Sequence, residues 1–215
     1  MPSVLSTKQL SPAQKNLLLN ADLSLTEYNF IQTQALELPA SVSEASYPNA
    51  IITSQTTVEL IQNFKIKTCY CVGENTALKL KSLGFDVELI AEQGKALAEA
   101  IIESYPDQAF TFFGSRQRRP ELSEALEKAK VSLTEIFVYE TLKTPKSFNR
   151  TFDAVLCFSP SGVDSFFEGN PNSASQLICI GETTARQAKL YTERIFISSK
   201  TSIESVIVKA VKVLK

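Results

Sequence analysis

The hydrophobic pattern along this chain alternates between two kinds of segment. Short apolar runs rich in β-branched residues end at glycines or at turns rich in hydroxyls, as where residues 69–72 run into Gly73. Between them lie segments in which apolar residues recur every three to four positions, as in residues 95–104. Because buried strands alternate with helices of about ten residues, the pattern predicts parallel sheets with helices on both faces.

The predicted elements follow one another along nearly the whole chain. Strands are expected at residues 4–6, 25–31, 50–53, 69–72, 86–90, 109–114, 132–141, 154–158, 176–180 and 194–197, and the last helix at 202–214. Ser11-Pro12 has the arrangement that opens a helix, and Gly84 the position that ends one. The extended run that begins at Leu25 stays apolar as far as Leu38, which is long for one domain.

Parts of the first half recur in the second half at a constant distance. Gly73-Glu-Asn-Thr76 and Gly181-Glu-Thr-Thr184 are separated by 108 residues, and the same distance separates Ser24-Leu-Thr-Glu27 from Ser132-Leu-Thr-Glu135. Pro12 and Pro120 share it too. These agreements predict a tandem duplication, and in a chain of 215 residues they favour two small domains over one large one.

Composition removes several classes of function. The net charge of −1 argues against binding to nucleic acid or to an acidic membrane surface. The start lacks the apolar run of a signal peptide and no run of 18 apolar residues occurs, so we expect a cytoplasmic protein. The four cysteines lie in apolar runs without CxxC spacing, which favours buried thiols over a metal or redox site. The absence of histidine excludes Ser-His-Asp triads and imidazole metal ligands.

Polar loops gather where the predicted strands end, the edge at which open α/β sheets bind ligands. Their hydroxyls and free N–H groups suit carboxylates or phosphates. The candidate binding residues are Thr53, Ser54, Gly73, Thr76, Arg116, Ser159, Ser161, Gly162, Gly181, Thr183 and Thr184. The alternative is that each Ser or Thr only caps its helix. Neither GxGxxG nor a P-loop pattern occurs, so no nucleotide-binding fingerprint is present.

Two further features have both a structural and a functional interpretation. Arg116, Arg118 and Arg119 form the densest basic cluster, which is either a solvated helix entrance or a clamp for ligand carboxylates. Tyr139 stands 108 residues after Ile31, so one copy carries a phenol where the other does not. A strand tyrosine usually belongs to a core or an interface. Tyr139 lies in the long extended run at residues 132–141. We expect this run to lead from one domain into the other, which would place Tyr139 near an interdomain cleft.

Four segments carry a resemblance to a known family. Cys71-Val-Gly-Glu-Asn-Thr-Ala77, Val138-Tyr-Glu-Thr141, Phe158-Ser-Pro-Ser-Gly162 and Ile180-Gly-Glu-Thr-Thr-Ala185 resemble signatures of the uroporphyrinogen-III synthase family, in matching order over nearly the whole length. The resemblance implies two flavodoxin-like α/β domains with parallel sheets, joined by a two-stranded linker. Residues 1–35 with 145–215 would form one domain and 36–144 the other, with a hinge at the linker.

The resemblance also implies an activity. The family closes hydroxymethylbilane, a linear tetrapyrrole with eight carboxylates, into a ring with inversion of the last pyrrole and loss of water; no cofactor is needed, and we expect a monomer. Tyr139 would donate a proton to the departing hydroxyl or hold the azafulvene that follows, while Ser159 and Thr184 would bind carboxylates. Glu74 and Glu182 suit helix N-termini, yet they would repel a carboxylate docked directly there.

Two alternatives remain open at this stage. A non-catalytic two-domain protein that closes on a small anion would explain the cleft, the hinge and the absence of histidine, but not the order of the signatures. A nucleotide-dependent enzyme is disfavoured because the phosphate loop is missing.

Overall fold

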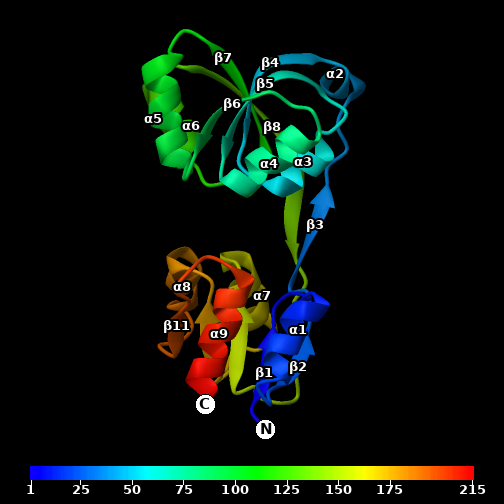
Figure 1. Ribbon diagram of the computed structural model, residues 1–215, viewed down its shortest axis with the longest axis vertical. Coiled ribbons are helices and arrows are strands. Elements are labelled where there is room, and N and C mark those ends of the chain that lie inside the picture. Colours follow the sequence, from blue (N-terminus) through cyan, green and yellow to red (C-terminus); the bar gives the residue numbers. More distant parts are fainter. The chain divides into compact units, whose positions relative to one another are not determined.

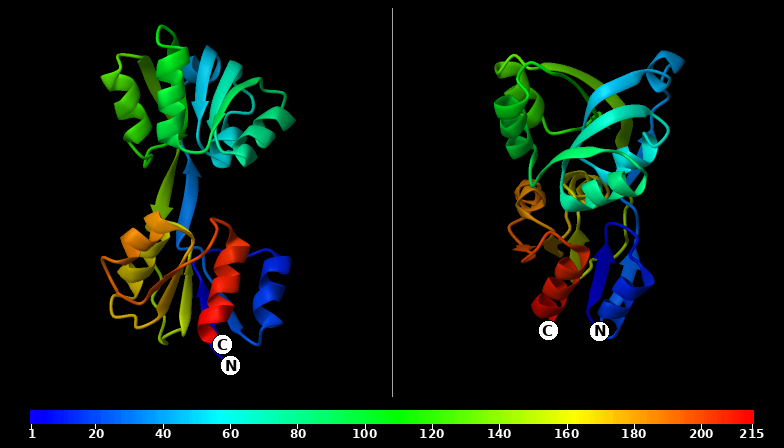
Figure 2. Two further views of the ribbon diagram at one scale, coloured as in Figure 1. Left: turned by 60° about the vertical axis from the view of Figure 1, so that its left-hand side comes forward. Right: turned by 45° about the horizontal axis from the view of Figure 1, so that its top comes forward.

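The computed structural model describes residues 1–215 and folds as two compact units, each with its own sheet (Figures 1 and 2). Unit 1 contains Met1–Gln32 and Leu142–Lys215, and unit 2 contains Thr33–Thr141. The chain therefore passes from unit 1 to unit 2 and back again. None of its helices is long and apolar enough to span a bilayer.

Unit 1 is built on a five-stranded sheet whose neighbouring strands are all parallel, in the order β11-β10-β9-β1-β2. The strands are β1 (Ser3–Ser6), β2 (Ser24–Glu27), β9 (Ala154–Cys157), β10 (Gln176–Cys179) and β11 (Ile195–Ile197). The helices are α1 (Pro12–Leu19), α7 (Pro160–Gly169), α8 (Glu182–Ala188) and α9 (Ile203–Leu214). Strands from the two ends of the sequence thus share one sheet, β1 lying between β2 and β9.

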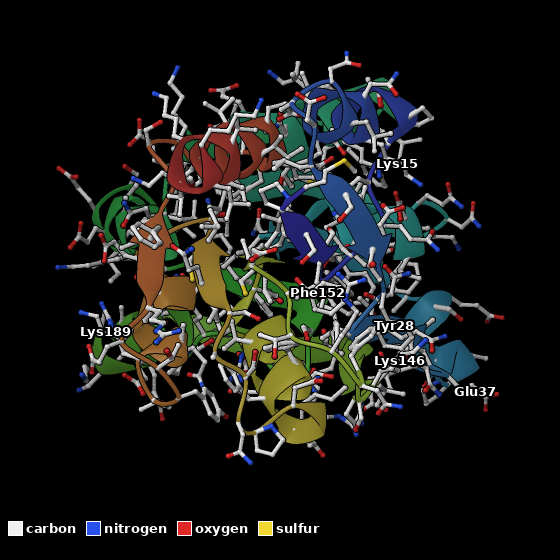
Figure 3. All side chains as sticks on the ribbon, turned by 90° about the horizontal axis from the view of Figure 1, so that it is seen from below. Lys15, Tyr28, Glu37, Lys146, Phe152 and Lys189 are labelled. Carbon is white, nitrogen blue, oxygen red and sulfur yellow. The ribbon has the colours of Figure 1, made fainter.

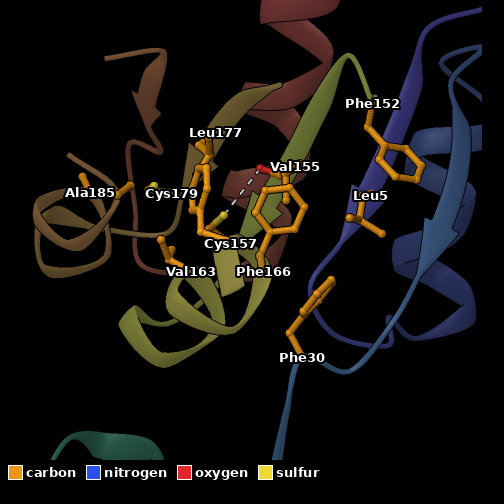
Figure 4. Close-up of a cluster of buried hydrophobic side chains, with 12 residues drawn as sticks. Leu5, Phe30, Phe152, Val155, Cys157, Val163, Phe166, Leu177, Cys179 and Ala185 are labelled. Atoms are coloured by element: carbon orange, nitrogen blue, oxygen red, sulfur yellow. Dashed lines mark hydrogen bonds between the residues drawn. The ribbon is translucent and has the colours of Figure 1, made fainter. Parts of the chain in front are cut away.

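The sheet of unit 1 is buried on both faces. Neighbouring residues point to opposite sides of a strand, so Val4 of β1 joins the core under α1 and α9, while Leu5 joins the core under α7 and α8. Figure 4 shows the second of these cores, where Phe30, Phe152 and Phe166 pack beside Leu5. Burial on both faces explains why the strands are continuously apolar in the sequence.

Unit 2 has a six-stranded sheet in the order β3-β8-β7-β4-β5-β6, in which the neighbouring strands from β8 to β6 are parallel. The strands are β3 (Ile31–Ala35), β4 (Ser46–Ile52), β5 (Lys65–Val72), β6 (Val87–Ala91), β7 (Ala109–Ser115) and β8 (Ser132–Lys143). The helices are α2 (Ala40–Ser43), α3 (Gln55–Leu60), α4 (Glu74–Ser82), α5 (Gly94–Ser104) and α6 (Glu121–Lys128).

Two cores also sandwich this sheet. Val58 of α3 and Leu80 of α4 pack on one face, and Leu97 of α5 and Leu126 of α6 pack on the other. Both sheets are therefore middle layers between helices, as the sequence predicts, and the mixed α/β fold with parallel sheets is confirmed.

Several helix ends form as their residues predict. Ser11 caps α1 through a capping box with Gln14, and Pro12 stands at the first helical position. After α4, Gly84 has a φ of +85°, a conformation that favours glycine, and its N–H bonds to the carbonyl of Lys81.

The prediction for the run that begins at Leu25 is wrong in detail. We expected one strand at 25–31 that continues towards Leu38, but the run is divided into β2 and β3, which belong to different sheets. Phe30, between them, is fully buried in the core of unit 1. Apolar continuity predicts burial, but it does not show that a chain passes from one core to the next.

Candidate functional site

Six of the predicted site residues lie along one edge of the unit 2 sheet. Because the strands are parallel, their carboxyl ends share an edge, and Ser54, Gly73 and Arg116 follow β4, β5 and β7 there. Tyr139 of β8 pairs with Ser115, the last residue of β7, so its ring belongs to the same edge. The complete set in unit 2 is Thr53, Ser54, Gly73, Thr76, Arg116 and Tyr139.

Tyr139 and Ser54 are in direct contact. The Tyr139 hydroxyl donates a long hydrogen bond of 3.4 Å to Ser54 Oγ, which also accepts from the N–H of Thr56 at 3.2 Å and so caps α3. Tyr139 is half-buried against the core of unit 2. The ring is held by packing, whereas the weakly bonded hydroxyl can turn towards a ligand. Ser54 thus caps α3 and also contacts the candidate catalytic phenol. Thr53 lies half-buried beside it.

The basic cluster separates into different roles. Arg118 pairs with Glu135 through two guanidinium nitrogens and lies 5.1 Å from the Phe137 ring. Both partners belong to β8, so these contacts give Arg118 a structural role. The Arg116 side chain is 59% exposed, and its Nη1 lies 3.4 Å from the Glu140 carboxylate. Since an exposed pair of this kind contributes little, Arg116 can exchange Glu140 for a ligand carboxylate. Its backbone N–H donates to the Tyr139 carbonyl at 3.0 Å, which fixes the loop beside the phenol.

Gly73 opens α4 in a conformation that only glycine adopts readily, with φ +86° and ψ 137°. A β-carbon at Gly73 would meet nothing within 4 Å, so the requirement for glycine is conformational and not steric. Thr76, one turn into α4, is 5% exposed. Glu74 occupies the first turn, where its charge favours the helix N-terminus.

The other six predicted residues lie along the corresponding edge of unit 1. Ser159 caps α7 by accepting from the N–H of Gly162 at 3.1 Å. Gly162 is buried, and a β-carbon there would lie 3.1 Å from Ser159 Oγ and 3.7 Å from Thr7 Oγ1. Ser161, between them, is half-buried. The turn after β9 is therefore closely packed around the Ser159 hydroxyl.

The turn after β10 differs in the accessibility of its two threonines. Gly181 opens α8 with an extended backbone of φ −177°, which any residue adopts. Thr183 is exposed, whereas Thr184 is only 1% exposed. Of the two hydroxyls, that of Thr183 is the more accessible to a ligand.

Sequence reasoning missed two cations at the edge of unit 1. Lys8 follows β1, with Nζ 5.9 Å from the Phe158 ring, and Lys200 follows β11; both are exposed. Lys8 precedes Arg116 by 108 residues, so the repeat distance itself was a signal for it.

The four cysteines are buried and free, as predicted. Burial raises the pKa of Cys69 to about 12 and that of Cys71 to about 11. A hydrogen bond with Cys179, followed by burial, raises the pKa of Cys157 well above its ordinary value. The thiols of Cys69, Cys71 and Cys157 therefore stay protonated near neutral pH and make poor nucleophiles or metal ligands. No three His, Cys, Asp or Glu side chains are grouped so as to hold a metal ion.

Comparisons with known proteins assign the family. The family model described as uroporphyrinogen-III synthase HemD matches residues 15–207. The structure is similar to uroporphyrinogen-III synthetase from Helicobacter pylori, with a TM-score of 0.72 and 16% identity over 99% of this chain and 100% of that one. It is also similar to a mutant uroporphyrinogen III synthase from Thermus thermophilus, with a TM-score of 0.68 and 15% identity over 99% and 98% of the two chains. No curated protein matches the sequence significantly. Because the family model spans most of the sequence, the chain belongs to the uroporphyrinogen-III synthase family.

Proposed function

We propose that this protein closes hydroxymethylbilane to uroporphyrinogen III, inverting the last pyrrole and releasing water, and that the carboxyl-edge loops of both units bind the substrate. The observation that carries the proposal is the family match over residues 15–207. In this reaction class the protein is a hydro-lyase of tetrapyrrole and heme biosynthesis.

The polar character of the two edges suits the substrate. A linear tetrapyrrole with eight carboxylates needs many donors spread over a long surface, and a protein of net charge −1 cannot supply them by its overall field. The edges offer Ser54 and Ser159, backbone N–H groups where helices begin, and the cations Arg116 and Lys8. Binding at many points would hold the chain curved, so that the inverted last ring attacks in preference to the uninverted one.

Tyr139 is the candidate catalytic residue. Its phenol is a proton donor beside Ser54, and the bond from the Arg116 N–H to the Tyr139 carbonyl holds the Arg116 loop next to it. We propose that it assists departure of the substrate hydroxyl, or orients the azafulvene that results. Glu74 and Glu182 lie in the first turns of α4 and α8, so the carboxylates would dock beside these residues and not onto them.

The activity is tested with freshly generated hydroxymethylbilane. The products are oxidised and separated by chromatography, and the same mixture with heat-denatured protein serves as the control. The expected result is uroporphyrinogen III, while the control yields the isomer that forms by unaided closure without inversion. An unchanged isomer ratio with folded protein would contradict the proposal.

The second candidate is a non-catalytic protein that binds a small anion through the same two edges. It is favoured only by the anion-binding character of the loops. It predicts that folded protein binds hydroxymethylbilane, detected by protection from spontaneous closure, yet leaves the isomer ratio of the eventual product unchanged.

We also propose that the chain arose by tandem duplication and that its two units are domains joined by a two-stranded linker with a hinge. Support comes from the passage of the chain between the units near Gln32 and again near Thr141. With the predicted boundaries of 1–35 plus 145–215 and 36–144, limited proteolysis should cut at 36–46 and 144–150 and leave the outer fragments associated. Release of two folded halves by one cut near Pro106 would contradict it.

We further propose that the active protein is a monomer in the cytoplasm. Light scattering coupled to size-exclusion chromatography should return about the mass of one 23.7 kDa chain. A stable dimer at micromolar concentration would overturn the first part, and fractionation of the source cell would test the second.

A further inference from the structure

A pocket of about 360 Å³ lies within unit 1, away from the loops discussed above. It is bounded by the segment that leads into β9 and by the turn that leads into β10. Its lining residues are Phe148, Asn149, Arg150, Thr151, Phe152, Phe166, Gly169, Asn170, Pro171, Asn172 and Ser173. Since both bounding segments precede parallel neighbouring strands, the pocket belongs to the amino edge of the sheet, opposite the edge that carries Ser159 and Gly181.

The walls of this pocket are fixed by Asn170. Its amide Nδ2 donates to the carbonyls of Lys146 and Phe166, at 2.8 and 2.9 Å, and its Oδ1 accepts from the N–H of Phe148 at 3.0 Å. At Gly169 a β-carbon would lie 2.6 Å from the Lys146 carbonyl oxygen, so the two segments touch backbone to backbone. The pocket is therefore a built feature and not a gap between two mobile loops.

Aromatic rings form one side of the pocket. Phe148 and Phe152 meet edge to face with centroids 5.3 Å apart, and Phe152 and Phe166 are each 2% exposed. The Arg150 guanidinium lies 4.8 Å from the centroid of the Phe152 ring. In this position the cation is held by the ring while its N–H groups stay available.

Arg150 is the only charged residue of the pocket lining. No Asp or Glu is among the lining residues, and Arg150 supplies a permanent positive charge. Lys146, on the same segment, lies over the rings of Tyr28 and Phe148 at 4.8 and 5.5 Å and adds to the positive potential (Figure 3). The adjacent Asp153 is engaged by the N–H and hydroxyl of Ser3.

The rim supplies neutral donors. The side chains of Asn149, Thr151 and Asn172 are exposed and make no hydrogen bond within the protein, and neither does the Arg150 guanidinium. A ligand would therefore meet amide and hydroxyl groups that need not first leave a protein partner.

We propose that this pocket binds a small monoanionic carboxylate carried on a planar ring. Arg150 pairs with the carboxylate, the amides of the rim bind its remaining lone pairs, and Phe148, the half-buried ring of the lining, packs against the ligand ring. The volume is at the small end for ligand pockets, which suits a single ring. Inorganic phosphate carries negative charge but has no ring to pack against the aromatic side. This site does not rest on the proposed function, since it shares no residue with the carboxyl-edge loops.

The test uses benzoate as the probe and the full-length protein. Titration is followed by backbone amide chemical shifts, with benzamide as the neutral isostere and inorganic phosphate as the ring-free anion. We expect saturable shifts at millimolar benzoate, confined to residues 146–153 and 166–173. Benzamide and phosphate should each bind about tenfold more weakly or worse, because each lacks one of the two recognition elements.

Arg150→Gln removes the charge but keeps a polar side chain of similar reach. It should weaken benzoate binding by about tenfold or more. Arg186→Gln, a charge-matched change at an exposed arginine of α8, should leave benzoate binding unchanged. Turnover of hydroxymethylbilane should be the same in Arg150→Gln and in the unaltered protein, which separates this pocket from the carboxyl-edge loops.

Three results would overturn the proposal. They are the absence of saturable shifts around the pocket, equal binding by Arg150→Gln and the unaltered protein, and binding of phosphate or benzamide as tight as that of benzoate. Because Arg150 is exposed, the variant is expected to fold, and its circular dichroism spectrum and unfolding temperature verify this.

Discussion

Units 1 and 2 share one plan. The strand order β11-β10-β9-β1-β2 in unit 1 corresponds to β6-β5-β4-β7-β8 in unit 2, and each corresponding pair overlaps when the sequence is shifted by 108 residues. The helices correspond as well: α1 to α6, α3 to α7, α4 to α8 and α5 to α9. The loops after β4 and β5 in unit 2, and the corresponding loops after β9 and β10 in unit 1, start their helices at a serine and a glycine, respectively.

The two units differ in the length of one corresponding strand and in the side chains that it carries. In unit 2 the strand that matches the short β2 is the twelve-residue β8, which carries Tyr139 and has β3 beside it. In unit 1 the chain after β2 leaves the sheet and places Phe30 in the buried core beside Phe166. The difference teaches that the same strand order yields the same kind of polar loop edge twice, while a single side chain, the phenol of Tyr139, makes the two edges chemically different.

The largest expected effect follows from Tyr139. Tyr139→Phe keeps the ring in the core and should lower kcat about 10²-fold or more, the usual contribution of a positioned acid. Stability should change little, because the hydrogen bond to Ser54 is 3.4 Å long. Steady-state kinetics and urea unfolding measure the two. A variant with normal turnover but lower stability would make Tyr139 a packing residue and remove the functional difference between the units.

The next effect concerns the glycines that open α4 and α8. Gly73→Ala should destabilise the protein by about 1–3 kcal/mol, because φ +86° is strained for any β-carbon. Gly181→Ala is the matched control: it shares the loss of a glycine cap, but its backbone is extended and its β-carbon meets only Thr201 Cγ2, at 3.3 Å. Urea unfolding should give the larger loss for Gly73→Ala. Equal losses would show that the two turns are conformationally equivalent.

The threonines in those helices test whether both edges bind substrate. Thr184→Val and Thr76→Val each remove a hydroxyl and preserve shape. If these hydroxyls bind carboxylates, KM should rise about tenfold in each variant, as for the loss of a hydrogen bond to a charged group. If the hydroxyls do not contact substrate, activity per folded molecule should stay level, and stability should change little because neither threonine caps its helix: the N-caps are Gly73 and Gly181. A rise in KM for one variant alone would show that a single unit binds at this position.

The smallest effect distinguishes the units by their response to acid. The N–H of Ser3, followed by its hydroxyl, lowers the pKa of Asp153, and a hydrogen bond from Gln14 lowers the pKa of Glu204; both carboxyls are in unit 1. A carboxyl group whose pKa is lowered in the folded protein stabilises the fold. This contribution is complete at pH values above the pKa of the unfolded chain, near 4, and is lost as the pH falls through the lower pKa of the folded protein.

Asp153→Asn should therefore reduce stability slightly at neutral pH, and the difference from the unaltered protein should shrink below about pH 4. Hydrogen exchange measured separately for amides of the two units would show the loss in unit 1. A difference that stays constant with pH would mean that the charge of Asp153 contributes nothing.

The local elements follow from the sequence alone. Apolar runs and helical periods predict the alternating strands and helices, Ser11-Pro12 predicts the start of α1, and Gly84 predicts the end of α4. These features are determined within a few residues of chain, by caps, backbone preferences and one-sided burial. Four short signatures, taken in their order along the chain, also indicate the family, which the family model over residues 15–207 shows.

Only the tertiary structure decides how distant segments combine. It divides the apolar run after Leu25 between two sheets, joins β1 to β9 across about 150 residues of sequence, and places the hydroxyl of Tyr139 against Ser54. It also separates Arg116 from Arg118, which the sequence presents as one cluster, and buries Thr184 while leaving Thr183 exposed. The physical reason is that strand pairing and side-chain burial depend on partners far away in the chain. A local pattern therefore shows that a residue will be paired or buried, but it does not identify the residues that pair with it or cover it.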